Sequence, residues 1–169
     1  TMTVSGSWTK GANATFTHNS GSVILDGGDQ TISGSTVFNN LTKTGSTSIT
    51  LTFSATARTS VSGALILKGT AQNNLNIRST ISSIASLTSL DTGGTETLQR
   101  LNVQDNDASG GQSLTCSFCT NAGGNTNWVF TSPIITGTLY SDEGVTGLAN
   151  KTMAMSVNGG AIIDKSETD

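Results

Sequence analysis

Short apolar segments recur between residues 13 and 107 and are separated by Gly, Ser, Thr and Asn. In some of them, such as residues 49–53 and 75–77, apolar residues alternate with polar ones, which is the period-two pattern of a β-strand. The clearest apolar segments are residues 22–25, 36–38, 49–53, 64–67 and 75–77. Two such strands in each coil of roughly two dozen residues would form a stack in which every coil buries its apolar face only against its neighbours. We therefore predict a parallel β-solenoid, or β-helix, over residues 1–131.

The composition fits a narrow core better than a rounded one. Only 34% of the 169 residues are hydrophobic and 5% are aromatic, and the abundant Thr and Ser suit the outer faces of sheets. Charged residues make up 11% of the chain and the net charge is -3, so no basic field attracts nucleic acid. No run approaches the roughly 20 apolar residues of a membrane-spanning helix. We expect neither nucleic acid nor a membrane span as a feature of this segment.

A second module is predicted from residue 132 onward. Pro133, the single proline of the chain, follows the last strand of the predicted solenoid, and proline disfavours continuation of a β-ladder. Residues 134–140 and 153–157 then show the alternation of antiparallel strands. The predicted fold class is therefore all-β, with a solenoid followed by a partial Ig-like β-sandwich at residues 132–169.

The first module resembles the repeats of very large bacterial surface proteins of the β-strand-repeat, adhesin-like kind. The resemblance rests on the runs 8–27 and 30–45 and on the related segments 75–79, 101–105 and 127–128. It implies a secreted or surface-anchored β-helical stalk and carries no catalytic residue, because the family is one of architecture more than of activity.

The second module is similar to the start of a carboxypeptidase-regulatory-like sandwich. The matching positions are residues 135–139, Asp142, Gly144, residues 148–150, residues 153–157, Thr168 and Asp169. A glycine and an aromatic strand normally follow the Thr-Asp pair in such modules, so the resemblance implies that part of the sandwich is missing. Either the module is truncated or a neighbouring chain completes its open sheet edge by donating a strand.

Cys116 and Cys119 have the C-x-x-C spacing of redox motifs and of half a zinc site. A common zinc site needs two further ligands, and the single histidine, His18, is far away in the sequence. A redox role favours a helix N-terminus that lowers a thiol pKa, whereas the flanking residues have the composition of a loop. We therefore expect a short-range disulfide, which also suits an oxidising, extracellular setting.

Asp105, Asp107 and Ser109, followed by Gly110, match the first half of a calcium loop. In such a loop alternate oxygen side chains face one point and the glycine allows a sharp turn. The bidentate acid expected at the twelfth position is absent, because Cys116 stands there. The three residues are a calcium candidate, and a solvated coil corner is the alternative. We expect no other cofactor.

No catalytic constellation is evident in the sequence. Arg58, Lys68, Arg78 and Arg100 are scattered, and no acid lies between residues 45 and 90 that could form an acid and base pair with them. We expect His18 to be an outward strand residue. Trp8 and Trp128, near the two ends of the predicted solenoid, are expected to cap its core, although exposed aromatics can also stack on sugars.

These observations favour a non-catalytic structural segment of an extracellular or cell-surface bacterial protein: a stalk, an adhesin or a filament building block. A carbohydrate-binding or carbohydrate-processing β-helix module is the alternative. The expected partners are surface glycans or copies of the chain itself, through end-to-end or strand-donating assembly. Because Thr1 stands in place of a start methionine, we expect the segment to be a piece of a longer secreted protein with its signal upstream.

Overall fold

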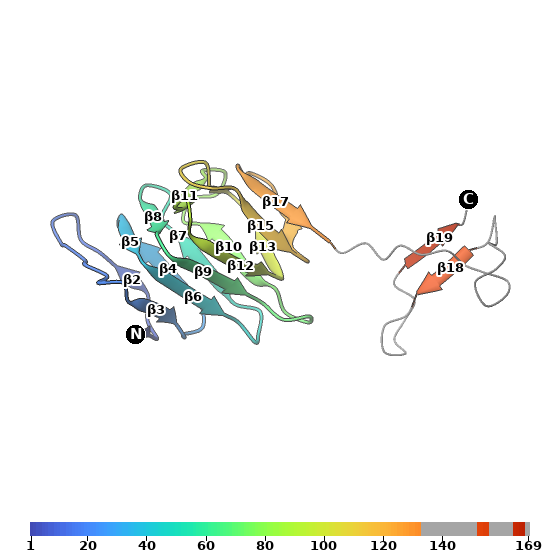
Figure 1. Ribbon diagram of the computed structural model, residues 1–169, viewed down its shortest axis with the longest axis horizontal. Coiled ribbons are helices and arrows are strands. Elements are labelled where there is room, and N and C mark those ends of the chain that lie inside the picture. Colours follow the sequence, from blue (N-terminus) through green and yellow to red (C-terminus); the bar gives the residue numbers. More distant parts are fainter. Residues whose placement is uncertain (133–151, 156–163, 168–169) are drawn as a thin grey trace. The chain divides into compact units, whose positions relative to one another are not determined.

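The computed structural model describes residues 1–132, 152–155 and 164–167, all of them without helix. The chain divides into two compact units, Thr1–Pro133 and Ile134–Asp169, drawn in Figure 1. We call residues 1–131 of the first unit the solenoid, because its strands coil into stacked parallel sheets. The prediction of an all-β fold with parallel sheets is confirmed.

Three parallel sheets form the solenoid. The first sheet contains, in spatial order, β1 (Met2–Val4), β3 (Ser22–Leu25), β6 (Asn40–Thr44), β9 (Ala64–Lys68), β12 (Thr95–Gln99), β15 (Leu114–Ser117) and β17 (Trp128–Thr131). The second contains β2 (Trp8–Thr9), β4 (Gln30–Ser33), β7 (Thr50–Phe53), β10 (Leu75–Ser79), β13 (Leu101–Val103) and β16 (Thr120–Asn121). The third contains β5 (Thr36–Phe38), β8 (Arg58–Val61), β11 (Ser86–Leu90) and β14 (Asn106–Asp107).

Each complete coil visits the first, second and third sheets in turn, so it contains three strands. The prediction of two strands per coil was wrong. The inward positions of the third sheet are partly polar: Thr36, Thr59 and Thr88 are in register across three strands and all are buried. Because threonine does not stand out from the surrounding Ser and Thr, a hydrophobic pattern does not reveal this side of the coil.

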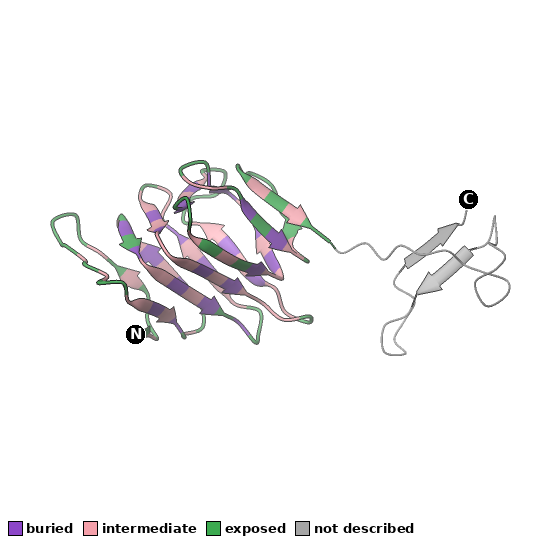
Figure 2. Cartoon of the chain, viewed as in Figure 1, coloured by how far each residue is buried: buried purple, intermediate pink, exposed green. Residues whose placement is uncertain are grey.

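The core is a narrow column of inward side chains that stack from coil to coil. In the first sheet, Leu25 is in register with Lys43, then with Leu67, Leu98, Cys116 and Phe130. The second sheet contributes a matching file of buried Leu, Ile, Phe and Val. Buried and partly exposed residues consequently alternate along the central strands, as Figure 2 shows. Neighbouring coils are about 4.8 Å apart, so each coil covers the apolar face of the one before it.

Coil length varies while the register of the inward positions is kept. Leu41 pairs with Leu65, 24 residues later, whereas Leu65 pairs with Glu96, 31 residues later. The extra residues lie in the connections between strands, such as the segment from residue 80 to residue 85. The strands therefore fix the core, and the corners absorb the differences in length.

Several corners are single residues with left-handed backbone. Arg100 (φ 53°) and Phe118 (φ 56°) turn the chain from the first sheet to the second, and Asp105 (φ 53°) turns it from the second to the third. Gly34 (φ 78°) occupies the equivalent second corner of an earlier coil, where a Cβ atom would lie 1.9 Å from the carbonyl oxygen of Lys10. Glycine is therefore required at this corner by both conformation and space.

In the second unit, the described strands are β18 (Thr152–Met155) and β19 (Asp164–Glu167), which pair antiparallel. The sandwich predicted for residues 132–169 lies largely outside the described residues, as does the strand expected at residues 134–140. The sandwich, and its truncation or completion by a neighbouring chain, stay predictions.

Candidate functional site

The side chain of Lys43 is fully buried in the core, at an inward position of β6. Its ammonium donates hydrogen bonds to the carbonyl oxygens of Gly27 and Gly28 and to Oε1 of Gln30. An ammonium group has three protons to donate, so these three acceptors satisfy it completely. We call this arrangement the Lys43 network.

Gln30 extends the Lys43 network to the preceding coil. Its Nε2 donates to the carbonyl oxygens of Val4, at 2.8 Å, and of Gly6. Burial lowers the pKa of Lys43, and the nearby carboxylates of Asp26 and Asp29 offset part of that effect. Polar groups from three successive coils are therefore tied together inside the corner between the first and second sheets, which is a structural role.

Sequence reasoning missed the Lys43 network, although the sequence holds a signal for it. Leu41 and Lys43 are two residues apart on one strand, so they share a face. A lysine in phase with a buried leucine is a charged residue at a core position, and such charges are rarely buried without partners.

A second buried polar cluster centres on Asn106 of β14, which has no exposed surface. Its Nδ2 donates to Ser86 Oγ at 3.0 Å and to Thr88 Oγ1 at 2.9 Å. Its Oδ1 accepts the indole N–H of Trp128 at 3.0 Å. The amide is thus fully used, and the Asn106 cluster joins β11, β14 and β17.

The calcium candidate residues lie around β14 but have separate partners. Asp105 accepts the backbone N–H of Ser83 at 2.9 Å, and Asp107 accepts that of Ser109 at 2.8 Å. Hydrogen bonds from the side chain and then the backbone of Ser109 hold the pKa of Asp107 below its ordinary value, and the charge of Arg58 adds to the effect. Within the described ranges no three His, Cys, Asp or Glu side chains form a group that could hold a metal ion. Calcium binding at Asp105, Asp107 and Ser109 stays a prediction.

Cys116 and Cys119 form a disulfide, so this prediction is confirmed. Cys116 is buried in the core on β15, in register between Leu98 and Phe130. Cys119 Sγ accepts the backbone N–H of Leu101 at 3.2 Å. The bond spans the left-handed corner at Phe118 and ties the last coils of the solenoid to the core.

Of the scattered basic residues, two are held by contacts within the solenoid. Arg78 donates to the carbonyl oxygens of Ile77, at 2.8 Å, and of Asn102, at 2.6 Å. The guanidinium of Arg100 lies over the Phe118 ring, 4.7 Å from its centroid. Both side chains support neighbouring coils and do not converge on a common point of the described surface.

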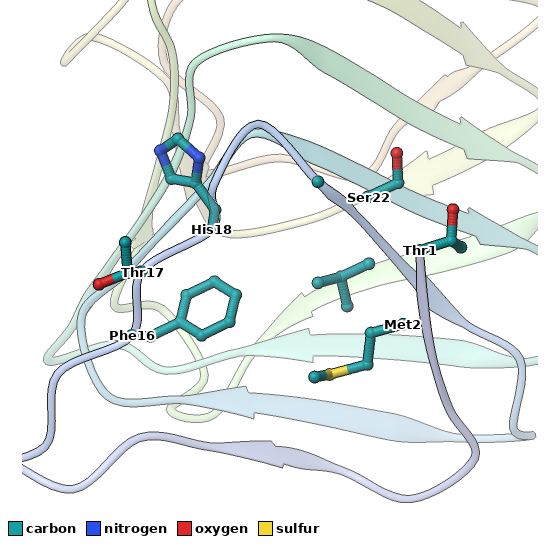
Figure 3. Close-up of a pocket in the computed structure, with 8 residues that line it drawn as sticks. Thr1, Met2, Phe16, Thr17, His18 and Ser22 are labelled. Carbon is teal, nitrogen blue, oxygen red and sulfur yellow. The ribbon is translucent and has the colours of Figure 1, made fainter.

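A shallow pocket lies beside β1 and β3, with His18 and Phe16 in its lining (Figure 3). Phe16 and Met2 point toward one another, and His18 Nδ1 accepts the backbone N–H of Ser20 at 3.1 Å. His18 lies in the strand-free connection between β2 and β3, so its prediction as a strand residue was wrong. The left-handed backbone of Asn19 and Ser20 turns the chain here in place of a strand.

No family model, curated protein or solved structure matches the chain. Among the residues that the structure describes, no helix has the length and apolar character needed to cross a membrane.

Proposed function

We propose that the chain is a non-catalytic structural segment of an extracellular or cell-surface bacterial protein, serving as a stalk or as the supporting part of an adhesin. The observation that carries the proposal is the continuous first sheet, in which seven parallel strands from successive coils stack over one core. Each added coil extends such a stack without enlarging its cross-section. Length gained in this way is what a supporting rod requires.

The buried polar groups support the same role. The Lys43 network and the Asn106 cluster each link successive coils through side chains that have their hydrogen-bonding partners inside the solenoid. These side chains use their hydrogen-bonding capacity to join neighbouring coils. The Cys116–Cys119 disulfide adds a covalent tie and suits an oxidising compartment outside the cytosol.

Surface location is tested on intact cells of the source organism with antibodies raised against the purified chain. Labelling of unpermeabilised cells, removed by external protease, is the expected result. Labelling that appears only after lysis would overturn the proposal. A cytoplasmic protein of the same cells serves as the control for membrane integrity.

Carbohydrate binding is the second candidate, and the pocket beside β1 and β3 favours it. The pocket combines the aromatic ring of Phe16 with the polar side chains of Thr17, His18 and Ser22, and sugar sites use aromatic faces together with a few polar groups. A glycan array probed with the full chain and with Phe16→Ala tests this function. Binding that the substitution removes would support it, and an array without signal would exclude the glycans tested.

A further inference from the structure

The third sheet is shorter than the other two. It has four strands, against seven in the first sheet and six in the second. In the first coil, a strand of the third sheet would lie between β2 and β3. The chain there is residues 10–21, which contain no strand. Beyond its last strand, β14, one isolated bridge joins Asp107 to Thr126. On the side of the third sheet the described stack is therefore stepped, with an N-terminal step over β5 and a C-terminal step beyond β14.

At the N-terminal step, Trp8 reaches from β2 across to β5. Its indole N–H donates to Thr36 Oγ1 at 3.1 Å. Its ring lies edge-on to Phe38, with centroids 5.0 Å apart, and to Phe16 of the strand-free segment, at 4.8 Å. Phe38 has no exposed surface, although it lies on the terminal strand of its sheet. The indole and Phe16 together thus seal the core at this end.

The C-terminal step is filled in the same way. Trp128 reaches from β17 to β14, where its indole N–H donates to Asn106 Oδ1 at 3.0 Å. The indole stacks on the ring of Phe130, with centroids 5.9 Å apart and planes 17° from parallel. Asn106 is fully buried, although β14 is the last named strand of the third sheet.

The same side-chain arrangement is therefore present at both steps. In each, an indole from a neighbouring sheet lies over the terminal strand of the third sheet and gives its N–H to an inward polar side chain of that strand. A further coil stacked on β5 would have to place its own inward side chains above Thr36 and Phe38. The ring of Trp8 already occupies that space.

We propose that Trp8 with Phe16, and Trp128 with Phe130, are caps that close the core on the side of the third sheet and so oppose end-on stacking of a second copy there. Copies that associate would then have to use the sides of the solenoid or the second unit. The proposal goes beyond the structural role proposed above and does not depend on it, because a capped and an uncapped solenoid can both serve as a stalk.

Sedimentation velocity of the full chain over a wide concentration range tests the N-terminal cap. The wild-type chain is expected to show no association through its capped ends at any concentration. Trp8→Ser, which removes the ring and leaves Thr36 and Phe38 uncovered, is expected to show a mean mass that rises with concentration toward that of a dimer or larger species. Phe118→Ser is the matched control: this aromatic is 42% exposed and lies outside both caps, so the variant should sediment as the wild-type chain does.

Circular dichroism establishes that each variant keeps its strands, and lysine cross-linking with mass spectrometry locates the contact. Lys10 lies next to the N-terminal cap, so end-on association of Trp8→Ser should join Lys10 residues of different copies. If Trp8→Ser unfolds, Phe16→Ser replaces it, because Phe16 belongs to no sheet. Wild-type chains linked through Lys10, or a folded cap variant that stays monomeric at all concentrations, would overturn the proposal.

Discussion

Replacement of the buried Lys43 by methionine should destabilise the solenoid strongly. The substitution keeps most of the unbranched stem, which packs in register between Leu25 and Leu67, and removes the ammonium group. The carbonyl oxygens of Gly27 and Gly28 and Oε1 of Gln30 then lose their donor. Lys43→Met therefore isolates the energetic contribution of the Lys43 network.

The size of the effect follows from the surroundings of each acceptor. Gln30 is 2% exposed, and an unsatisfied acceptor at such a site costs about 2 kcal/mol. Gly27 is partly exposed and Gly28 is exposed, so we assign their two carbonyls together a smaller cost of about 1 to 2 kcal/mol. The variant no longer buries a charged group, and the desolvation free energy saved in this way offsets part of the loss in stability. We expect a net loss of about 3 kcal/mol, or a melting temperature lower by about 10 °C.

Urea denaturation of the two chains, followed by circular dichroism, measures the difference. Lys68→Met is the matched control, because Lys68 lies on the next strand of the same sheet at a partly exposed position and should change stability by less than about 0.5 kcal/mol. A Lys43→Met chain within about 1 kcal/mol of wild type would refute the assignment. Equal losses in both variants would refute it as well.

The lowered pKa of Lys43 also fixes the sign of a pH effect. In the window just below the ordinary lysine pKa of 10.5, the unfolded chain holds the Lys43 proton more firmly than the folded one. Unfolding then takes up protons, so the unfolding free energy of wild type should rise with pH relative to that of Lys43→Met. A difference that falls through this window would contradict the burial argument.

Three further outcomes are expected. Asn106→Ala should cost about 3 kcal/mol by breaking three hydrogen bonds. Asn102→Ala, whose buried Oδ1 finds no hydrogen-bonding partner among the described residues, should be nearly neutral in the same thermal melt. The pKa of Asp107 is lowered on folding, so its carboxylate stabilises the folded chain above pH 3.8 and this contribution is lost at more acid pH. Asp107→Asn should therefore be slightly less stable than wild type above pH 3.8 and should lose less stability on acidification. Identical acid titrations of the two chains would count against this. Replacing both Cys116 and Cys119 by Ala should cost roughly 2 kcal/mol, as loop-closure entropy implies for so short a ring, and no change in chemical denaturation would exclude a stabilising role.

The alternation of large apolar residues was sufficient to predict the parallel, all-β core. It works for β7 and β9 because their inward residues are Leu or Phe. It fails for the third sheet, where Thr36, Thr59 and Thr88 point inward and differ little from exposed threonines in sequence. The number of strands per coil was therefore beyond a hydrophobic pattern.

In the candidate site, too, some features could be predicted from the sequence and others could not. The Cys116–Cys119 bond could be predicted from the C-x-x-C spacing together with the lack of further zinc ligands nearby in the sequence, because all of this information is local. The partners of Lys43 and Asn106 could not, since they come from other coils, 13 to 22 residues away along the chain. Only knowledge of which coils are neighbours brings these groups together.

The coils differ in length, but their inward residues stay in register, and this affects how related chains can diversify. The offset between paired residues reaches 31 without disturbing the inward positions, so an insertion at a corner leaves the spine unchanged and adds residues only on the outside. Related chains can therefore acquire new epitopes at their corners while their backbone hydrogen bonding is conserved. The same property makes the connection at residues 80–85 a natural place to graft a foreign peptide.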